Sequence, residues 1–287
     1  MPDILSESGK KGLDEKVWII FILPIIFSQI SYSQGFLVTP IKEDLSCISP
    51  GKIDFTLRVF NSGSPGNFRV YPLGIQQERD GSLKFVLSSP PTYSCSEWIT
   101  IHPSVFSLTS GQQKEIICTI NIPPGQSGDK YAAIVTEQVI GKDKGKEFPI
   151  RVRIATLVRV RILEKDVEPR ASISKIQTKN IDDFPKRIKL ICSVKNESKV
   201  QINAKVKIKI VGQKEEIFSL AHLRGGGGTI LPFTTRDFTG EIRRPASIEK
   251  FKAIVTLTYT HDNRGKTLIT ETHVPLTALV PNSFTKK

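Results

Sequence analysis

The sequence predicts an all-β protein of two tandem β-sandwich domains that follow an N-terminal signal segment. Val, Ile, Thr and Phe recur in short runs that alternate with polar residues, at the two-residue period of strands. Clusters of Gly, Pro, Asn and Ser separate these runs, and helix-forming stretches are scarce. A chain of 287 residues has room for two domains of ordinary size.

Residues 1–33 have the three-part layout of a secretory signal peptide. Lysines precede the apolar run "VWIIFILPIIF", and "SQISYS" follows it, with Ser31 and Ser33 placed for a cut ahead of Gln34. The apolar run is short for a bilayer span. An uncleaved membrane anchor is the alternative, because the preceding segment is long and also contains acids. Either way the rest of the chain is expected to be exported, to a periplasm or the cell surface, and to meet a membrane only through this segment if it is uncleaved.

The first sandwich is expected over residues 34–163. About seven or eight short strands with regular turn signals are typical of an immunoglobulin-like sandwich. The expected strands lie in "GFLVTPIKEDL", "GKIDFTLRVFNSG", "FRVYPLGIQQ", "SLKFVLSS", "WITIHPSVFSLTSGQQKEIICTINIPPGQSGDKYAAIVTEQV" and "EFPIRVRIATLVRVRIL".

A charged, proline-containing linker is expected at residues 164–171, and a second immunoglobulin-like sandwich at residues 172–287. Its strands are expected in "ASISKIQTK", "RIKLICSVKNES", "QINAKVKIKIVG", "EEIFSLAHL", "TILPFTTRDFTGEI", "FKAIVTLTYTH" and "KTLITETHVPL". Both domains end a strand in Asn directly before a small polar turn, in "RVFNSGS" and "SVKNESK". This similarity suggests two copies of one architecture.

The formal net charge of the chain is +13 at pH 7. A strongly basic exported protein favours anionic surfaces such as cell-wall polymers, lipid headgroups or acidic protein partners. Nucleic acid is not expected as a partner, because the basic residues are spread along alternating strand positions and no recognised nucleic-acid-binding motif occurs.

The sequence assembles no set of residues for catalysis, metal binding or cofactor binding. The four histidines share no spacing. "HDN" at residues 261–263 reads as a hairpin turn, and "RGGGG" at 224–228 lacks the lysine and Ser or Thr of a phosphate loop. We therefore expect a non-enzymatic protein with no metal and no cofactor.

The four cysteines divide into two groups. Cys118 and Cys192 are in phase with apolar neighbours and should lie in cores. Cys47 and Cys95 lie in turn-like sequence of one domain, so they are the expected pair if a single disulfide forms.

The stretch "EFPIRVRIATLVRVRIL", residues 147–163, is long for one strand. One face would carry Ile150, Val152, Ile154, Val158, Val160 and Ile162, and the other Arg151, Arg153, Arg159 and Arg161. The apolar face can simply fill the domain's own core, while the arginines form a solvated face that discourages aggregation. The alternative is an additional role in binding a partner polypeptide.

The segment from Trp98 to Val139 resembles the first domain of periplasmic pilus chaperones. A tryptophan strand leads through Pro103, Phe106 and Gly111 to an alternating strand that ends in "IPP", and a Gly-Asp-Lys-Tyr turn opens the next. The same region is similar to the sandwich of exported WxL-interacting proteins. In the second half, "SVKNES", "GGTILPFTTRDFTGEI" and "FKAIVTLTYTHDNRGKTLITETHVPL" resemble the second domain of WxL-interacting proteins, although that family's C-terminal membrane helix is missing.

The pilus-chaperone resemblance implies a mechanism. The closing strand of the first domain would pair with an incomplete exported subunit, and basic residues between the domains would hold the subunit's C-terminal carboxylate. The expected contact residues are Ile150, Val152, Ile154, Val158 and Val160, with Lys42 and either Arg159 or Arg161 as the basic residues. The expected function is assembly or presentation of surface or pilus polypeptides, with an exported protein subunit or surface protein as partner. The alternative is a cell-surface adhesin or wall-binding protein of the WxL-interacting type, whose basic faces contact an anionic cell-wall polymer.

Overall fold

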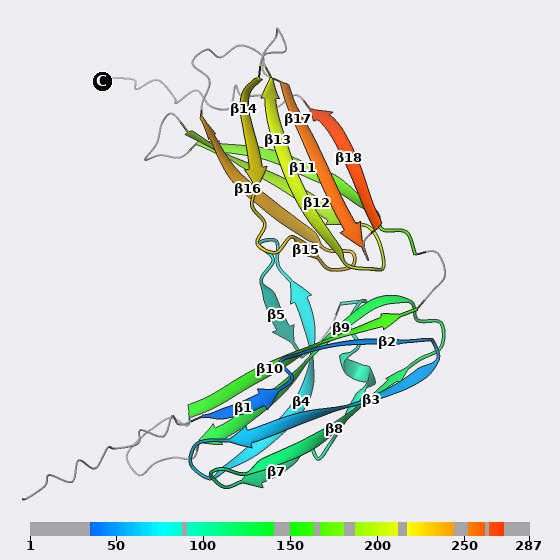
Figure 1. The fold of residues 1–287 in the computed structure, drawn as a ribbon, viewed down its shortest axis with the longest axis vertical. Helices are drawn as coiled ribbons and strands as arrows, with labels where there is room; N and C mark the ends of the chain where they lie inside the picture. The colour runs from blue at the N-terminus through cyan, green and yellow to red at the C-terminus, as the bar shows by residue number, and fades with distance from the viewer. Residues whose placement is uncertain are drawn as a thin grey trace, which may run out of the picture. The chain divides into compact units, whose positions relative to one another are not determined.

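The structure is a computed structural model that describes residues 35–87, 91–140, 150–163, 167–180, 187–211, 217–243, 252–261 and 264–272. The signal segment and its expected cut lie outside these residues. The part of the chain described contains strands and one short 3₁₀ helix, η1 (Ser96–Trp98). No helix in that part is long and apolar enough to cross a membrane. Four sheets form two sandwiches, so the predicted all-β fold class is confirmed (Figure 1).

The first sandwich consists of two sheets built from strands β1 to β10. One sheet has the order β1 (Phe36–Thr39), β3 (Gly51–Asn61), β8 (Gln113–Ile122), β6 (Ile99–His102). The other has the order β2 (Lys42–Cys47), β10 (Ile150–Ile162), β9 (Gly128–Ile140), β4 (Gly66–Gln77), β5 (Leu83–Val86), and β7 (Val105–Leu108) also pairs with β4.

The expected first strand, "GFLVTPIKEDL", is divided in the structure. β1 pairs with β3 in one sheet, whereas β2 pairs with β10 in the other. Pro40 stands between them and has no N–H to continue a ladder, so the chain leaves the first sheet there. The crossing segment is attached to β10, because the Thr156 hydroxyl donates to the Pro40 carbonyl at 2.8 Å.

The core of the first sandwich lies between its two sheets. Leu57, Val59 and Ile116 from one sheet meet Phe68, Ile134 and Val160 from the other. Phe68 also contacts Phe36 edge to face and stacks on Phe106. Cys118 is fully buried in this core, as its phase predicts.

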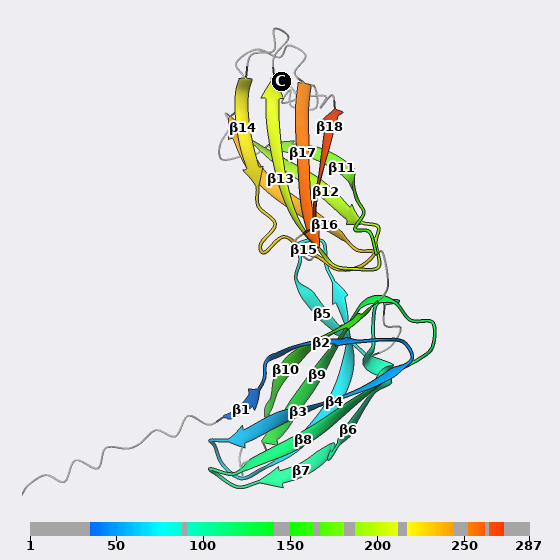
Figure 2. The same cartoon turned by 45° about the vertical axis from the view of Figure 1, so that its right-hand side comes forward.

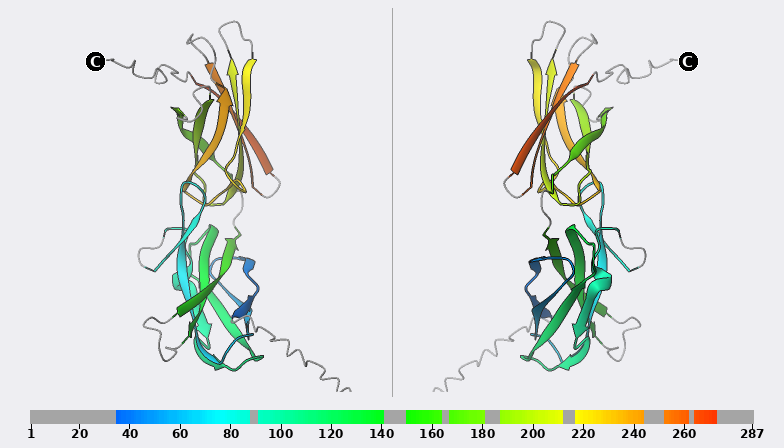
Figure 3. Two further views of the ribbon diagram at one scale, coloured as in Figure 1. Left: turned by 90° about the vertical axis from the view of Figure 1, so that its left-hand side faces the viewer. Right: turned by 90° about the vertical axis from the view of Figure 1, so that its right-hand side faces the viewer.

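The second sandwich has the same two-layer construction, which Figures 2 and 3 show from other directions. One sheet has the order β11 (Ala171–Asn180), β12 (Arg187–Asn196), β16 (Thr235–Arg243). The other has the order β14 (Ile217–Leu223), β13 (Ile202–Val211), β17 (Lys252–His261), β18 (Arg264–Thr272), with β15 (Thr229–Ile230) also paired to β13. Its core includes Leu190, Ile208, Phe238 and Val255, and Cys192 is fully buried among them.

Two polar segments considered in the sequence analysis border strands of the second sandwich. His261 and Arg264 are opposite each other at the ends of β17 and β18. Residues 262–263 of "HDN" lie outside the described residues, so the expected hairpin turn stays a prediction. The "RGGGG" run connects β14 to β15.

Candidate partner-binding site

Strand β10 is paired on both sides for only half of its length. It pairs with β9 from Ile150 to Ile162, but with β2 only from Leu157 to Ile162. Among the residues that the structure describes, no strand covers the second side of residues 150–156. We call this half, residues 150–156, the open edge.

The backbone of the open edge points its polar groups outward at every second residue. The Leu157 N–H donates to the Ile41 carbonyl at 3.0 Å, and so points away from β9. Because a strand alternates with a period of two, the N–H and C=O groups of Arg151, Arg153 and Ala155 point to the same side. These groups are the donors and acceptors that an added strand needs.

The apolar face of β10 also divides at Thr156. Val158 and Val160 are buried in the core, and the strand is paired on both sides there. Val152 and Ile154 are half-buried and pack against the rim of the same core. Of the expected apolar contact residues, Val158 and Val160 are therefore structural, because no partner can reach side chains inside the core. Ile150 belongs to the open edge by its backbone.

The two arginines of the open edge share one carboxylate. Arg153 Nε lies 2.6 Å from Glu137 Oε2, and Arg151 Nη1 lies 3.7 Å from Glu137 Oε1. The Tyr71 hydroxyl donates to the same carboxylate at 2.8 Å. Burial raises the pKa of Glu137, but the Tyr71 and Arg153 hydrogen bonds outweigh it, so this pKa lies below its ordinary value.

Lys42 and Arg159, two of the basic residues expected from the resemblance, both contact Asp44. Lys42 Nζ is 2.6 Å from Asp44 Oδ2, and Arg159 Nε is 2.7 Å from Asp44 Oδ1. Parallel register produces this cluster, because Lys42 is opposite Leu157 and Asp44 is opposite Arg159. Arg161 instead contacts the buried carboxylate of Asp129 at 3.2 Å. Arg159 is therefore the better candidate for the basic residue at the end of the strand.

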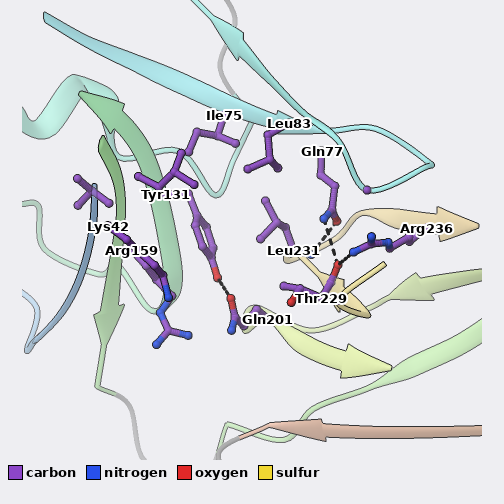
Figure 4. A pocket seen from close by; sticks show the side chains of 14 residues that line it. Lys42, Ile75, Gln77, Leu83, Tyr131, Arg159, Gln201, Thr229, Leu231 and Arg236 are labelled. Carbon is purple, nitrogen blue, oxygen red and sulfur yellow. Dashed lines mark hydrogen bonds between the residues drawn. The ribbon is translucent and has the colours of Figure 1, made fainter. Parts of the chain in front are cut away.

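Lys42 and Arg159 line a pocket of about 360 Å³ between the two sandwiches (Figure 4). Arg236 of β16 supplies a third cation. No carboxylate is present among the described residues that line the pocket. Its polar lining includes Gln77, Gln201 and Thr229, and its apolar lining includes Ile75, Leu83, Leu157 and Leu231. Such a lining suits an anionic group attached to an apolar residue.

The second sandwich completes this pocket through side chains that the sequence did not indicate. Gln77 at the end of β4 donates to the Thr229 carbonyl at 3.1 Å and accepts from the Leu231 N–H at 3.0 Å. The Tyr131 hydroxyl donates to Gln201 Oε1 at 2.6 Å. These partners are at least 70 residues apart in sequence, so no local pattern could reveal them.

Arg236 is held in place by backbone carbonyls. Its guanidinium donates to the Thr229 carbonyl at 2.6 Å and to the Asp80 carbonyl at 3.4 Å. The residue is only 6% exposed, and this burial lowers the pKa of its guanidinium. Arg236 thereby links the β4–β5 turn to the second sandwich.

The cysteines are all free thiols in the structure, Cys47 half-buried and the other three buried. The expected bridge between Cys47 and Cys95 is not formed there, and it stays a prediction. Burial raises the pKa of the Cys95 thiol to about 12, so this thiol is protonated at neutral pH. Among the described residues no group of three or more His, Cys, Asp or Glu could hold a metal ion.

No protein-family model and no curated protein matches the chain. It is similar to solved structures of chaperones. The class 5 fimbriae chaperone CfaA is 16% identical with a TM-score of 0.45, and the likeness covers 84% of this chain and 100% of that one. The E. coli chaperone DraB is 15% identical, with a TM-score of 0.38 and coverage of 84% and 98%. A structure of Salmonella enterica SafA pilin in complex with the SafB chaperone is 13% identical, with a TM-score of 0.38 and coverage of 84% and 96%.

Proposed function

We propose that this chain is an exported, non-enzymatic, chaperone-like protein that binds an exported subunit through the open edge of β10. The observation that carries the proposal is the unpaired side of residues 150–156. An incomplete subunit that lacks a strand could pair with this edge, and its backbone would satisfy the outward groups of Arg151, Arg153 and Ala155.

The pocket adds a second point of contact for the same partner. Lys42, Arg159 and Arg236 are cations that could hold a terminal carboxylate, while Leu157 and Leu231 could contact the last apolar side chain. Asp44 already pairs with Lys42 and Arg159, so an incoming carboxylate would share or displace those ion pairs. The edge would supply affinity, and the pocket would fix the position of the partner's end.

The test removes one backbone donor from the open edge. The Arg153 N–H points away from β9, so Arg153→Pro should keep the strand's own ladder and abolish one hydrogen bond to an added strand. Arg153→Ala is the matched control, because it also loses the ion pair with Glu137 but keeps the N–H. The full exported chain would be purified from host envelopes, and the exported polypeptides that accompany it would be quantified by mass spectrometry.

Arg153→Ala should retain most of the captured polypeptide. Arg153→Pro should capture at least about fivefold less polypeptide than the wild type. A backbone hydrogen bond contributes about 1 kcal/mol, and the proline ring also obstructs the approach of the partner's strand. Arg151→Pro applies the same test at the neighbouring outward-facing N–H of the open edge, and it replaces Arg153→Pro if that variant does not fold. Full capture by a folded proline variant would contradict binding through strand addition.

A further inference from the structure

The outer face of the β14-β13-β17 sheet carries a row of lysines. Lys205, Lys207 and Lys209 are alternate residues of β13 and therefore point to the same side. Lys205 and Lys207 are exposed and Lys209 is half-exposed. At about 3.4 Å per residue, neighbouring lysines of the row are about 7 Å apart along the strand.

The neighbours of this lysine row do not neutralise it. On β17 the cross-strand partners of the row are Thr258, Thr256 and Ile254, and on β14 His222 and Leu220 lie opposite Lys207 and Lys209. Within the described residues no carboxylate forms an ion pair with any lysine of the row. Three like charges this close repel one another, so an anionic ligand along β13 would be stabilised by all three.

A hollow of about 520 Å³ lies at one end of the lysine row. Lys205 and Arg224 line it, together with the exposed Thr260 and the backbone of Gly225–Gly228. Gly228 has a positive φ of 73°, and a Cβ there would be 2.5 Å from the Ala204 carbonyl, so only glycine lets the loop approach β13 this closely. The hollow extends the cationic face beyond the strand through Lys205 and Arg224, and Thr260 adds a hydroxyl there.

We propose that this face binds a linear, phosphate-bearing polyol polymer of the cell envelope. Single phosphates linked by short polyol units present charges at a spacing of the same order as the lysines. The cross-strand neighbours of the lysine row include no Phe, Tyr or Trp, the side chains that often anchor protein partners. Lysine is also depleted in protein interfaces. The proposal is independent of strand addition, because the lysine row belongs to the second sandwich and the open edge to the first.

The test compares two triple variants with equal charge change. Lys205, Lys207 and Lys209 are replaced together by Gln in one. In the control, Lys179, Lys189 and Lys195 are replaced by Gln; these lysines are exposed on β11 and β12, in the opposite sheet of the same sandwich. Binding of the full exported chain to fluorescent poly(glycerol phosphate) is measured by anisotropy at several salt concentrations. Poly-glutamate and vesicles containing phosphatidylglycerol are the competing probes.

We expect the lysine-row variant to bind at least about tenfold more weakly than the wild type, and the control to stay within about twofold. The slope of log affinity against log salt should fall by about two, because each lost phosphate contact removes somewhat less than one from it. If the lysine-row variant fails to fold, Lys207→Gln alone should still weaken binding more than Lys189→Gln. Equal loss of binding in both triple variants would show that only the net charge of the protein matters, and would contradict a site at the lysine row. Equal or tighter binding of poly-glutamate or of the vesicles would overturn the choice of ligand.

Discussion

At the scale of single residues, Asn61 and Asn196 make the same arrangement of buried hydrogen bonds in the two sandwiches. Each is fully buried at the end of a strand, β3 or β12. The Asn61 amide donates to three carbonyls, and its oxygen accepts from the Gly63 N–H. The Asn196 amide also donates to three carbonyls, and its oxygen accepts from Ser198. Residues 196–198, "NES", fit the Asn-X-Ser pattern of N-glycosylation, but in the folded protein the amide nitrogen of Asn196 is buried and already donates to backbone carbonyls.

Replacing either asparagine by alanine should strongly destabilise its own sandwich. Asn61→Ala leaves the carbonyls of Leu108 and Thr109 without this donor, and the expected loss is about 2–4 kcal/mol of unfolding free energy. Urea unfolding followed by Trp98 fluorescence would measure the loss in the first sandwich. Asn121→Ala, at an exposed position of β8, should change it by less than about 0.5 kcal/mol. Comparable losses in both variants would argue against the buried-asparagine explanation.

At the scale of elements, β10 combines a core strand and an edge strand in one run. The alternation of apolar residues and arginines is regular from Ile150 to Ile162, apart from the segment around Thr156, so the sequence indicates the two faces correctly. It does not indicate the pairing, because that depends on where β2 joins the sheet. β2 begins at Lys42, after the chain has crossed from the first sheet at Pro40.

The two halves of β10 should respond differently to the loss of a side chain. Val160→Ala creates a cavity beside fully buried residues and should cost about 2 kcal/mol. Val152→Ala removes half-buried atoms at the rim of the core, so it should cost less than about 1 kcal/mol. Both losses can be read from urea unfolding of the first sandwich, with Leu163→Ala as an exposed control just beyond the strand. Similar costs for the two valines would show that the open edge is as well packed as the core half.

At the scale of the whole molecule, the sequence predicts the fold class well and the candidate site only in part. Strand periodicity is local, so alternation identified the strands, and Cys118 and Cys192 were correctly placed in cores. Lys42 and either Arg159 or Arg161 were expected through a family resemblance; β2–β10 pairing brings Lys42 and Arg159 together, and their role in binding stays a prediction. Gln77, Gln201 and Arg236 were missed because their roles depend on contacts between segments far apart in the chain. For Val158 and Val160 the sequence left open a place in the domain's own core or a contact with a partner, because periodicity cannot distinguish a side chain facing a core from one facing a ligand; both are buried in the core.

The turn between β4 and β5 attaches to the second sandwich through Arg79, and this attachment should depend on pH. Arg79 donates to both carboxylate oxygens of Asp237 at 3.0 and 2.8 Å, and to Ser193 Oγ at 2.7 Å. Burial raises the pKa of Asp237, but the hydrogen bonds from Arg79 and Ser193 outweigh it, so this pKa is below its ordinary value. A lowered carboxyl pKa stabilises the fold above the unfolded-state value, and this contribution disappears as the pH falls through the folded-state value.

Asp237→Asn should therefore destabilise the protein at pH 7 by about 1 kcal/mol, a discounted value because Arg79 is largely exposed. The difference from wild type should shrink as the pH falls below about 4, where the wild-type carboxyl becomes protonated and also loses its charge. Urea midpoints at a series of pH values would measure it, with the exposed Glu97→Gln as a control that should differ little from wild type at any pH. A difference that stays constant down to pH 2 would mean that the Asp237 charge does not stabilise the attachment, and that the Asn side chain acts through packing alone.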